Sequence, residues 1–137
     1  MSRSELTENE ATFVRWARVA RMATVAPDGQ VHNVPISPVL VDGRILIATD
    51  TVSKKVRNIE FEPRVSVVFD EYSEMWELLH GVVIEGRVRI LREGESFSRG
   101  RAELYEKYRQ YEIESPIEEG ASVLLDVAPD RVLSWGF

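Results

Sequence analysis

The residues best suited to chemistry lie between Ile45 and Val68, where an apolar strand leads into a short basic helix. Ser53 is a good helix N-cap, because its hydroxyl can accept a hydrogen bond from a free first-turn amide. Lys54 and Lys55 follow it directly. Positive side chains at a helix N-terminus oppose the helix dipole, so they cost free energy unless an anion is bound. The strand end, the free amides and the lysines together predict a phosphate-binding cradle.

The same residues are compatible with a plainer interpretation, in which an ordinary capped helix turns its lysines toward water. Clusters of charge in a sequence are most often solvated surfaces. The spacing of the residues does not by itself choose between these two interpretations. The helix is expected to stop near Pro63, and Arg64 to Phe69 is expected to form the next strand.

Composition places the chain among soluble globular proteins. It has 137 residues, of which 44% are hydrophobic and 29% are charged. This length suits one domain with a real core, so a single domain over 1–137 is expected. The formal charge is −6. An acidic chain argues against a general nucleic-acid-binding protein, which would usually be basic, so no nucleic-acid partner is expected.

Several kinds of site are excluded by residues that the chain lacks. Without cysteine there can be no disulfide, thiolate metal site or cysteine nucleophile, and no metal site is predicted. His32 and His80 are the only imidazoles. No apolar run approaches the ~20 residues of a membrane span. The first residues lack the apolar core of a signal peptide, so no membrane partner and a cytoplasmic location are expected.

Hydrophobic periodicity predicts the elements that position the cradle. Thr7 and Glu10 have the spacing of a capping box, and a helix is expected over 8–18 with Phe13 and Trp16 in an apolar stripe that packs into the core. A longer helix is expected over 95–112. Six to seven short strands are expected, over 21–26, 31–37, 44–49, 64–69, 80–91, 121–127 and 131–137, with 39–41 continuing the apolar run of the second. Their hairpin-like spacing favours a mainly β protein with peripheral helices, built as an antiparallel barrel that leaves no exposed edge.

Two positions in these strands are irregular. Pro35 has no amide proton, so it indicates an edge or open stretch. Gly86 indicates a bulge or a close approach of another backbone. Pro129 and Asp130 form a turn signal between the last two expected strands.

Four segments in order resemble the flavin-binding split-barrel superfamily of pyridoxamine-phosphate-oxidase-like proteins, including its coenzyme F-420 branch. They read ATDTVSKKVRNI, PRVSVVF, HGVVIEGRVRIL and RVLSWGF. The resemblance implies a six-stranded antiparallel split β-barrel with Greek-key topology. It also implies a homodimer with two equivalent cofactor sites at the subunit interface, where FMN or coenzyme F-420 would bind.

The same resemblance implies a set of cofactor-binding residues. Ser53 to Lys55 match the motif that holds the cofactor phosphate, and the strand around Pro35 matches the one that runs beside the flavin ring. His80 is considered as a donor to the ring or substrate, and Trp135 as a stacking residue, although structural roles suit both. The full predicted set is Val34, Pro35, Ile36, Ser37, Ala48, Thr49, Ser53, Lys54, Lys55, His80 and Trp135.

No catalytic residue is predicted, because a flavin carries the hydride chemistry itself. True pyridoxamine-phosphate oxidases have an Arg and a Lys on the strand here formed by His32 to Ser37, and an Arg-containing tail. This chain lacks both, which argues against pyridoxal-phosphate chemistry. The resemblance therefore implies an FMN- or F-420-dependent oxidoreductase acting on a small organic substrate. The alternatives are a non-catalytic flavin store, carrier or sensor, and a haem-binding protein with His32 or His80 as axial ligand.

Overall fold

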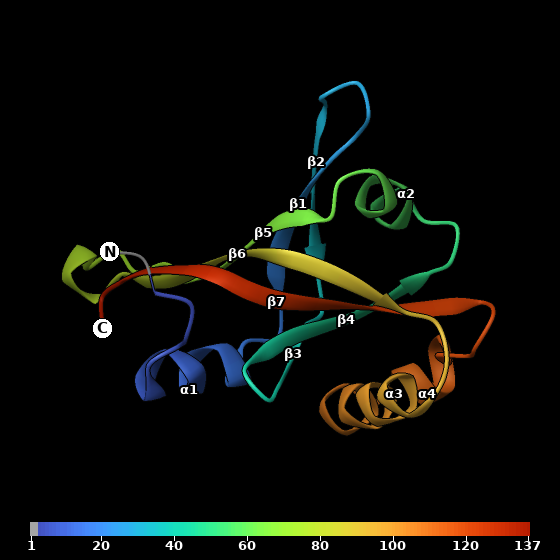
Figure 1. Cartoon of the computed structure of the whole chain (residues 1–137). Helices are drawn as coiled ribbons and strands as arrows, with labels where there is room; N and C mark the ends of the chain where they lie inside the picture. Colours follow the sequence, from blue (N-terminus) through green and yellow to red (C-terminus); the bar gives the residue numbers. More distant parts are fainter. Residues whose placement is uncertain (1–2) are drawn as a thin grey trace.

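One antiparallel sheet of seven strands forms the framework of the protein (Figure 1). The structure is a computed structural model that describes residues 3–137. The strands are β1 (Ala20–Val25), β2 (Val31–Ile36), β3 (Val39–Val41), β4 (Arg44–Asp50), β5 (Arg64–Glu71), β6 (His80–Leu91) and β7 (Ser122–Trp135). The helices are α1 (Glu8–Trp16), α2 (Lys54–Phe61), α3 (Glu95–Lys107) and α4 (Tyr111–Glu114), with a 3-10 turn η1 (Trp76–Leu78). None of these helices is long and apolar enough to cross a membrane.

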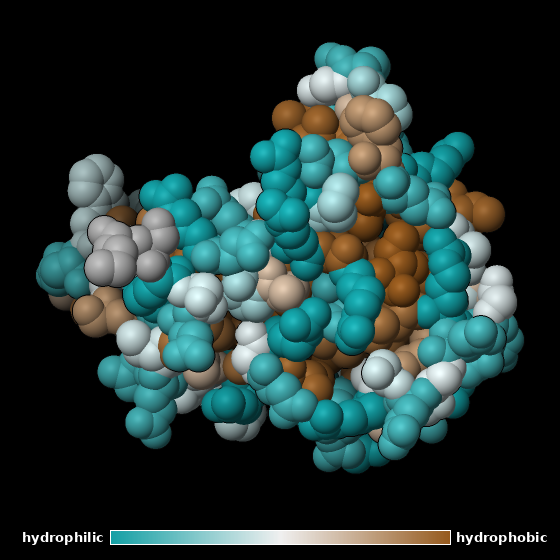
Figure 2. Space-filling view, in the orientation of Figure 1, coloured by the Kyte–Doolittle hydropathy of each residue, from teal (hydrophilic) through white to brown (hydrophobic). Residues whose placement is uncertain are grey.

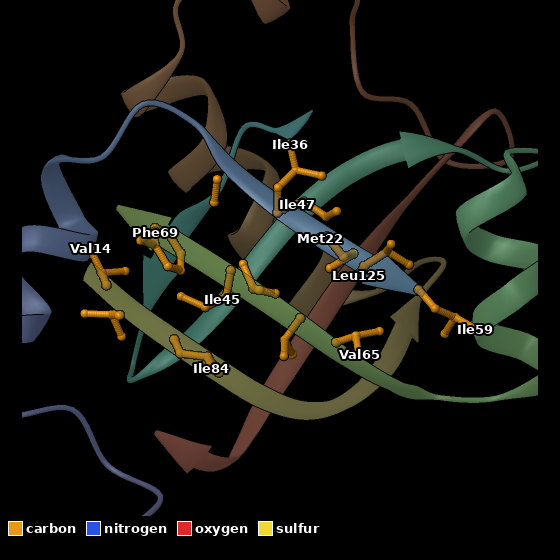
Figure 3. Packing of buried hydrophobic residues seen from close by; sticks show 14 of the residues in the cluster. Val14, Met22, Ile36, Ile45, Ile47, Ile59, Val65, Phe69, Ile84 and Leu125 are labelled. Atoms are coloured by element: carbon orange, nitrogen blue, oxygen red, sulfur yellow. The ribbon is translucent and has the colours of Figure 1, made fainter. Parts of the chain in front are cut away.

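The sheet curls around one main core. Its strand order is β2-β1-β5-β6-β7-β4-β3, with antiparallel neighbours throughout. Met22 of β1 and Ile47 of β4 nevertheless belong to the same buried cluster, together with Phe69, Ile84 and Leu125 from the strands between them (Figure 3). Strands from opposite sides of the sheet can share a core only if the sheet bends round on itself. Burial of this apolar surface is the main stabilising contribution.

A mainly β antiparallel fold with helices is confirmed, but the six-stranded closed barrel is wrong in strand number and in closure. The sheet has seven strands, and β2 and β3 are its two edges. β3 forms a hairpin with β4 through Asp42 and Gly43, whose positive φ values of 51° and 75° suit a type I′ turn. Pro38, between β2 and β3, has no amide to donate. The chain passes from edge strand β2 to the opposite edge strand β3 through Ser37 and Pro38.

A single long strand, β7, replaces the two strands and the turn predicted at Pro129 and Asp130. Glu85 of β6 pairs with Arg131, and the next residue, Gly86, pairs with Pro129, so Asp130 is left over as a bulge. A Cβ at Gly86 would lie 2.3 Å from the backbone oxygen of Ala128. The predicted bulge and close approach are therefore confirmed. A proline at a bulge does not end a strand, because the backbone there is already unpaired. The turn predicted at Pro129 and Asp130 is therefore wrong.

The helix predictions were correct in position but not in every boundary. The short basic helix begins after Ser53 and ends before Pro63, as predicted. The long helix predicted over 95–112 is instead divided into α3 and α4, with non-helical backbone at Tyr108 (φ −123°). Core packing of Trp16 is wrong, because this side chain is 76% exposed. The buried side of α1 is set by Glu10 and Val14, and a residue two positions past Val14 points the other way.

A buried carboxylate joins the N-terminal segment to α1 and the end of β7. Glu10 is 1% exposed and accepts hydrogen bonds from the Thr7 amide at 2.8 Å, from both Arg3 guanidinium nitrogens at 2.7 and 2.5 Å, and from the Ser134 hydroxyl. The Thr7 hydroxyl accepts from the Glu10 amide at 3.2 Å, so the predicted capping box is confirmed. Hydrogen bonding to Arg3, which outweighs the opposing effect of burial, lowers the pKa of Glu10 to about 2.

Candidate functional site

The N-terminus of α2 is held firmly against the sheet. The Ser53 hydroxyl accepts a hydrogen bond from the Val56 amide at 3.3 Å. The buried side of α2 carries Val56 and Ile59 into the main core. Asn58, also buried, donates to the Thr24 hydroxyl of β1 at 3.0 Å. These contacts fix the direction in which the first turn, with its unpaired amides, faces.

That first turn borders a cleft of about 240 Å³ between β2 and β4. β2 is an edge strand, so one row of its backbone groups has no strand partner here. Five residues predicted to bind a cofactor meet in this cleft: Pro35, Ile36, Ser37, Ala48 and Lys55. Val34, Thr49, Ser53 and Lys54 neighbour these residues in the chain without lining the cleft. The cleft is named the seam cleft below.

Lys55 gives the seam cleft a positive charge that no carboxylate neutralises. None of the ion pairs formed within residues 3–137 includes Lys54, Lys55 or Arg57. The first turn of α2 also contains no acidic residue. Lys55 is half-buried and lines the cleft, whereas Lys54 is exposed and does not. An uncompensated cation beside free helix amides favours a bound anion, so the phosphate-cradle interpretation is physically consistent here.

Sequence reasoning missed two residues of the seam cleft, Val19 and Tyr111. Tyr111 belongs to α4, far along the chain from β2 and β4. Its ring packs edge-on against the Tyr108 ring, with centroids 6.0 Å apart. No sequence signal distinguished Tyr111 from the other tyrosines of the same helical region, because its position depends on how α4 folds back on the sheet.

The end of α3 is anchored to the corner that follows β2. The Tyr108 hydroxyl donates to the Pro38 carbonyl at 2.7 Å, and the Lys107 ammonium donates to the same oxygen at 2.8 Å. The Arg18 guanidinium lies 4.7 Å from the centre of the Tyr108 ring. Burial, helped by the charge of Arg18, lowers the pKa of Lys107 to about 8, and burial raises the pKa of Tyr108. This anchor holds α4 beside the seam cleft.

The pKa of Lys107 tests whether its amine is buried against the Pro38 carbonyl. After reductive methylation with ¹³C-formaldehyde, the Lys107 signal should titrate with a midpoint near pH 8, well below the roughly 10.4 of an unperturbed lysine. The physical reason is that burial disfavours the charged amine. NMR spectra across pH 6–11 measure this midpoint, and the variant Lys107→Arg identifies the signal by removing it. A midpoint above pH 10 would show that Lys107 is solvated and the anchor open.

The other two predicted residues, His80 and Trp135, lie away from the seam cleft. They begin β6 and end β7, whereas the cleft residue Ala48 pairs with Leu124, which pairs with Leu91 at the opposite end of β6. A strand of this length spans on the order of 35 Å at ~3.3 Å per residue. Within one chain, His80 and Trp135 therefore do not share a site with Lys55.

Both of these residues have structural partners. The two ring nitrogens of His80 lie 3.1 Å from a Glu71 carboxylate oxygen and 2.9 Å from the Leu78 carbonyl. Trp135 covers Gly81, where an added Cβ would lie 2.3 Å from the indole ring. His32 is opposite Thr24 on the β1–β2 hairpin, and its Nδ1 is buried with no hydrogen-bond partner in residues 3–137. Neither histidine lines the seam cleft.

The described residues hold no cluster of three or more histidine or acidic side chains that could bind a metal ion. What the seam cleft offers chemically is one cation, helix amides and an unpaired strand edge. Such a site can bind and orient an anionic ligand with a planar, hydrogen-bonding part. It contains no arrangement of acid and base that would perform proton transfer on its own.

The chain matches a known protein family and a characterised reductase over nearly its whole length. The family model of pyridoxamine 5′-phosphate oxidase matches residues 6–136. A curated relative, the 5a,11a-dehydrotetracycline/5a,11a-dehydrooxytetracycline reductase of Streptomyces rimosus subsp. rimosus, is 28% identical over 135 residues, which cover 95% of this chain and 82% of the relative. The match therefore spans almost the whole of the present sequence.

Solved structures share the fold. A conserved hypothetical protein from Mycobacterium tuberculosis superposes with a TM-score of 0.81 at 28% identity, covering 98% of this chain and 89% of that one. A haem-binding protein from Mycobacterium smegmatis superposes with a TM-score of 0.81 at 18% identity, covering 99% of this chain and 56% of that one. An F420 reductase superposes with a TM-score of 0.75 at 19% identity, covering 93% of this chain and 98% of that one. The last two likenesses, at such low identity, concern the fold alone.

Proposed function

Because the chain belongs to the pyridoxamine 5′-phosphate oxidase family, we propose that it is an oxidoreductase that uses FMN or coenzyme F-420. The observation that carries this proposal is the meeting of Pro35, Ser37, Ala48 and Lys55 in the seam cleft. These residues come from β2 and the loop after it, from β4 and from α2, and all of them were expected to contact a cofactor. The relative that reduces dehydrotetracyclines supports a reductase of a small organic molecule.

The residues present fit the phosphate of either cofactor. Lys55 and the first-turn amides of α2 would bind the phosphate, since both carry positive charge that no acidic side chain offsets. The free edge of β2 around Pro35 would hydrogen-bond the edge of the ring and so orient it. The bound group would supply the hydride chemistry, and the protein would supply binding, orientation and exclusion of water.

The test is titration of the purified protein with FMN and, separately, with F-420, followed by absorbance and fluorescence. We expect one of the two to bind at one molecule per protomer. The loaded protein is then supplied with 5a,11a-dehydrooxytetracycline as a trial acceptor, and reoxidation of the reduced cofactor is followed. Binding of neither cofactor to folded protein would overturn the proposal. Tight binding without turnover of any acceptor would instead support a cofactor store, carrier or sensor.

The two histidines of the described residues do not form a recognisable haem site. An axial ligand needs a free imidazole nitrogen directed into a cavity. Both nitrogens of His80 have partners, and His32, whose Nδ1 has no hydrogen-bond partner within residues 3–137, lines neither the seam cleft nor the cleft beside β5 and β6. Haem binding is therefore not proposed.

We propose in addition that the protein is a homodimer. A 15.7 kDa monomer is expected to expose about 7,300 Å², whereas this chain exposes 8227 Å². The outer face of the sheet has a hollow of about 570 Å³, lined in part by Ala23, Val25 and Val31. Figure 2 shows apolar side chains gathered in a hollow at the base of the β1–β2 hairpin, with hydrophilic ones around them. Excess surface with an apolar hollow is typical of a protomer that associates.

Replacing Val31 by Asp should shift the protein toward monomer. Val31 is 66% exposed and lines the hollow, so a charge there would be desolvated in a dimer but not in the folded monomer. Light scattering coupled to size-exclusion chromatography measures the mass of wild type and variant. Val52→Asp is the matched control, because Val52 is 79% exposed and lies outside the hollow. A monomeric wild type, or a variant of unchanged mass, would argue against this face as the interface.

A further inference from the structure

We infer that a second cleft beside the seam cleft binds the substrate, and that it takes a planar ring compound bearing hydroxyl or amino groups. This inference rests on the proposed function, and names the substrate class for that same site. The second cleft has a volume of about 230 Å³. Its lining residues are Ser37, Tyr108, Gln110, Tyr111, Glu114 and Ser115. It is called the α4 cleft below.

The α4 cleft and the seam cleft are two parts of one site. They share two lining residues, Ser37 and Tyr111. Each cleft alone, at about 240 and 230 Å³, is smaller than the ~300–1,000 Å³ usual for a ligand site. Together they reach about 470 Å³, which lies within that range. A ligand bound in the α4 cleft would therefore adjoin whatever occupies the seam cleft next to Ser37.

The walls of the α4 cleft are aromatic and firmly placed. Tyr108 and Tyr111 line the cleft, with ring centroids 6.0 Å apart, and the Tyr105 ring lies behind Tyr111 at a centroid distance of 6.5 Å. Tyr108 is fixed by its hydrogen bond to Pro38, and the Tyr105 hydroxyl accepts from the Ile117 amide at 2.9 Å. Aromatic walls of this kind favour flat ring systems, which can stack against them.

Charge separates the roles of the two clefts. Lys55 is the one charged residue among those that line the seam cleft, and Glu114 is the one among those that line the α4 cleft. A carboxylate repels an anionic phosphate and accepts hydrogen bonds from hydroxyl and amino groups. Gln110 and Ser115 lie beside Glu114 and can donate or accept. The α4 cleft is therefore suited to a neutral or cationic ring compound with polar substituents, and poorly suited to the cofactor phosphate.

Equilibrium binding of 1,5-dihydroxynaphthalene to the cofactor-loaded protein tests this inference, with naphthalene as the probe that lacks hydroxyls. Fluorescence titration of both probes is carried out on wild type and on Glu114→Gln. We expect wild type to prefer the dihydroxy compound, and Glu114→Gln to raise its Kd about fivefold. This is less than the tenfold or more expected for a fully desolvated charge-assisted hydrogen bond, because Glu114 is exposed. The Kd of naphthalene should change less than twofold.

A second variant makes the test independent of charge. Tyr111→Ala removes a wall of the α4 cleft and should weaken both probes, whereas Glu112→Gln, on the same short helix but outside both clefts, should leave them unchanged. Far-ultraviolet circular dichroism confirms that each variant is folded. Displacement of bound cofactor by dihydroxynaphthalene, or equal effects of Glu114→Gln on both probes, would overturn the inference. Failure of FMN and F-420 to bind at all would contradict the proposed function instead, and that result is read from the cofactor titration alone.

Discussion

Replacing Lys55 by alanine is expected to weaken binding of FMN or F-420 by about 10- to 100-fold. A hydrogen bond to a charged group contributes roughly 1.5–3 kcal/mol, and each 1.4 kcal/mol is a factor of ten in affinity. Lys55 is half-buried in the seam cleft, so its charge is less screened than that of an exposed lysine. Fluorescence titration at a fixed ionic strength measures the change.

The neighbouring lysine supplies the control for this experiment. Lys54 is exposed and does not line the seam cleft, so Lys54→Ala should change the Kd less than threefold. The two variants remove the same charge from consecutive positions of the same helix turn. A larger increase in Kd for Lys55→Ala than for Lys54→Ala would therefore show that Lys55 contacts the phosphate. Loss of positive charge near the helix N-terminus would affect both variants alike. Equal losses in both variants would show that the phosphate does not bind in the seam cleft.

The second large effect is expected from Glu10→Ala, which should destabilise the folded chain by about 2–4 kcal/mol. The substitution removes the partner of Arg3 and Ser134 and one half of the capping box with Thr7. Loss of a buried hydrogen-bonded carboxylate typically costs this much, because its donors are left unpaired. Urea unfolding measures the free energy, and the midpoint of thermal unfolding should fall by roughly 10 °C.

Glu8→Ala is the matched control for Glu10→Ala. Glu8 lies in the same first turn of α1 but is exposed, so its removal should cost no more than about 1 kcal/mol through the helix dipole. Similar losses for both variants would mean that the buried network adds nothing beyond an exposed first-turn charge.

The same network makes stability depend on pH in a defined window. The hydrogen bonds from Arg3 lower the pKa of Glu10 to about 2, whereas an unfolded glutamate has a pKa of about 4.3. The contribution of Glu10 is therefore complete above about pH 4.3 and is lost as the pH falls toward 2. The difference in free energy of unfolding between wild type and Glu10→Gln, measured with urea, should therefore decrease as the pH falls through this window. A difference that stays constant from pH 5 to pH 2.5 would contradict the assignment.

Local patterns predicted most of the elements correctly. The capping box of Thr7 and Glu10, the N-cap at Ser53 and the hairpin at Asp42 and Gly43 each depend on residues close together in the chain. Short-range hydrogen bonds and backbone preferences are therefore readable from sequence. Trp16 was misplaced because the buried side of α1 carries Glu10, whose burial depends on contacts with Arg3 and Ser134 that hydrophobic periodicity does not register. Pro129 was misread because a proline at a bulge and a proline in a turn give the same local signal.

What the sequence by itself determined is the β-rich class, the basic α2 N-terminus and most residues of the seam cleft. The class and the basic helix follow from residue types and spacing along single elements, whereas Pro35 to Ser37 and Ala48 were implied by the resemblance to the split-barrel superfamily. The tertiary structure alone decided that Lys55, not Lys54, faces the cleft, that Tyr111 joins it, and that His80 and Trp135 lie at the far end of β6 and β7. The physical reason is that such placements depend on sheet order and on the return of α4 over the sheet, which bring together residues from distant parts of the chain.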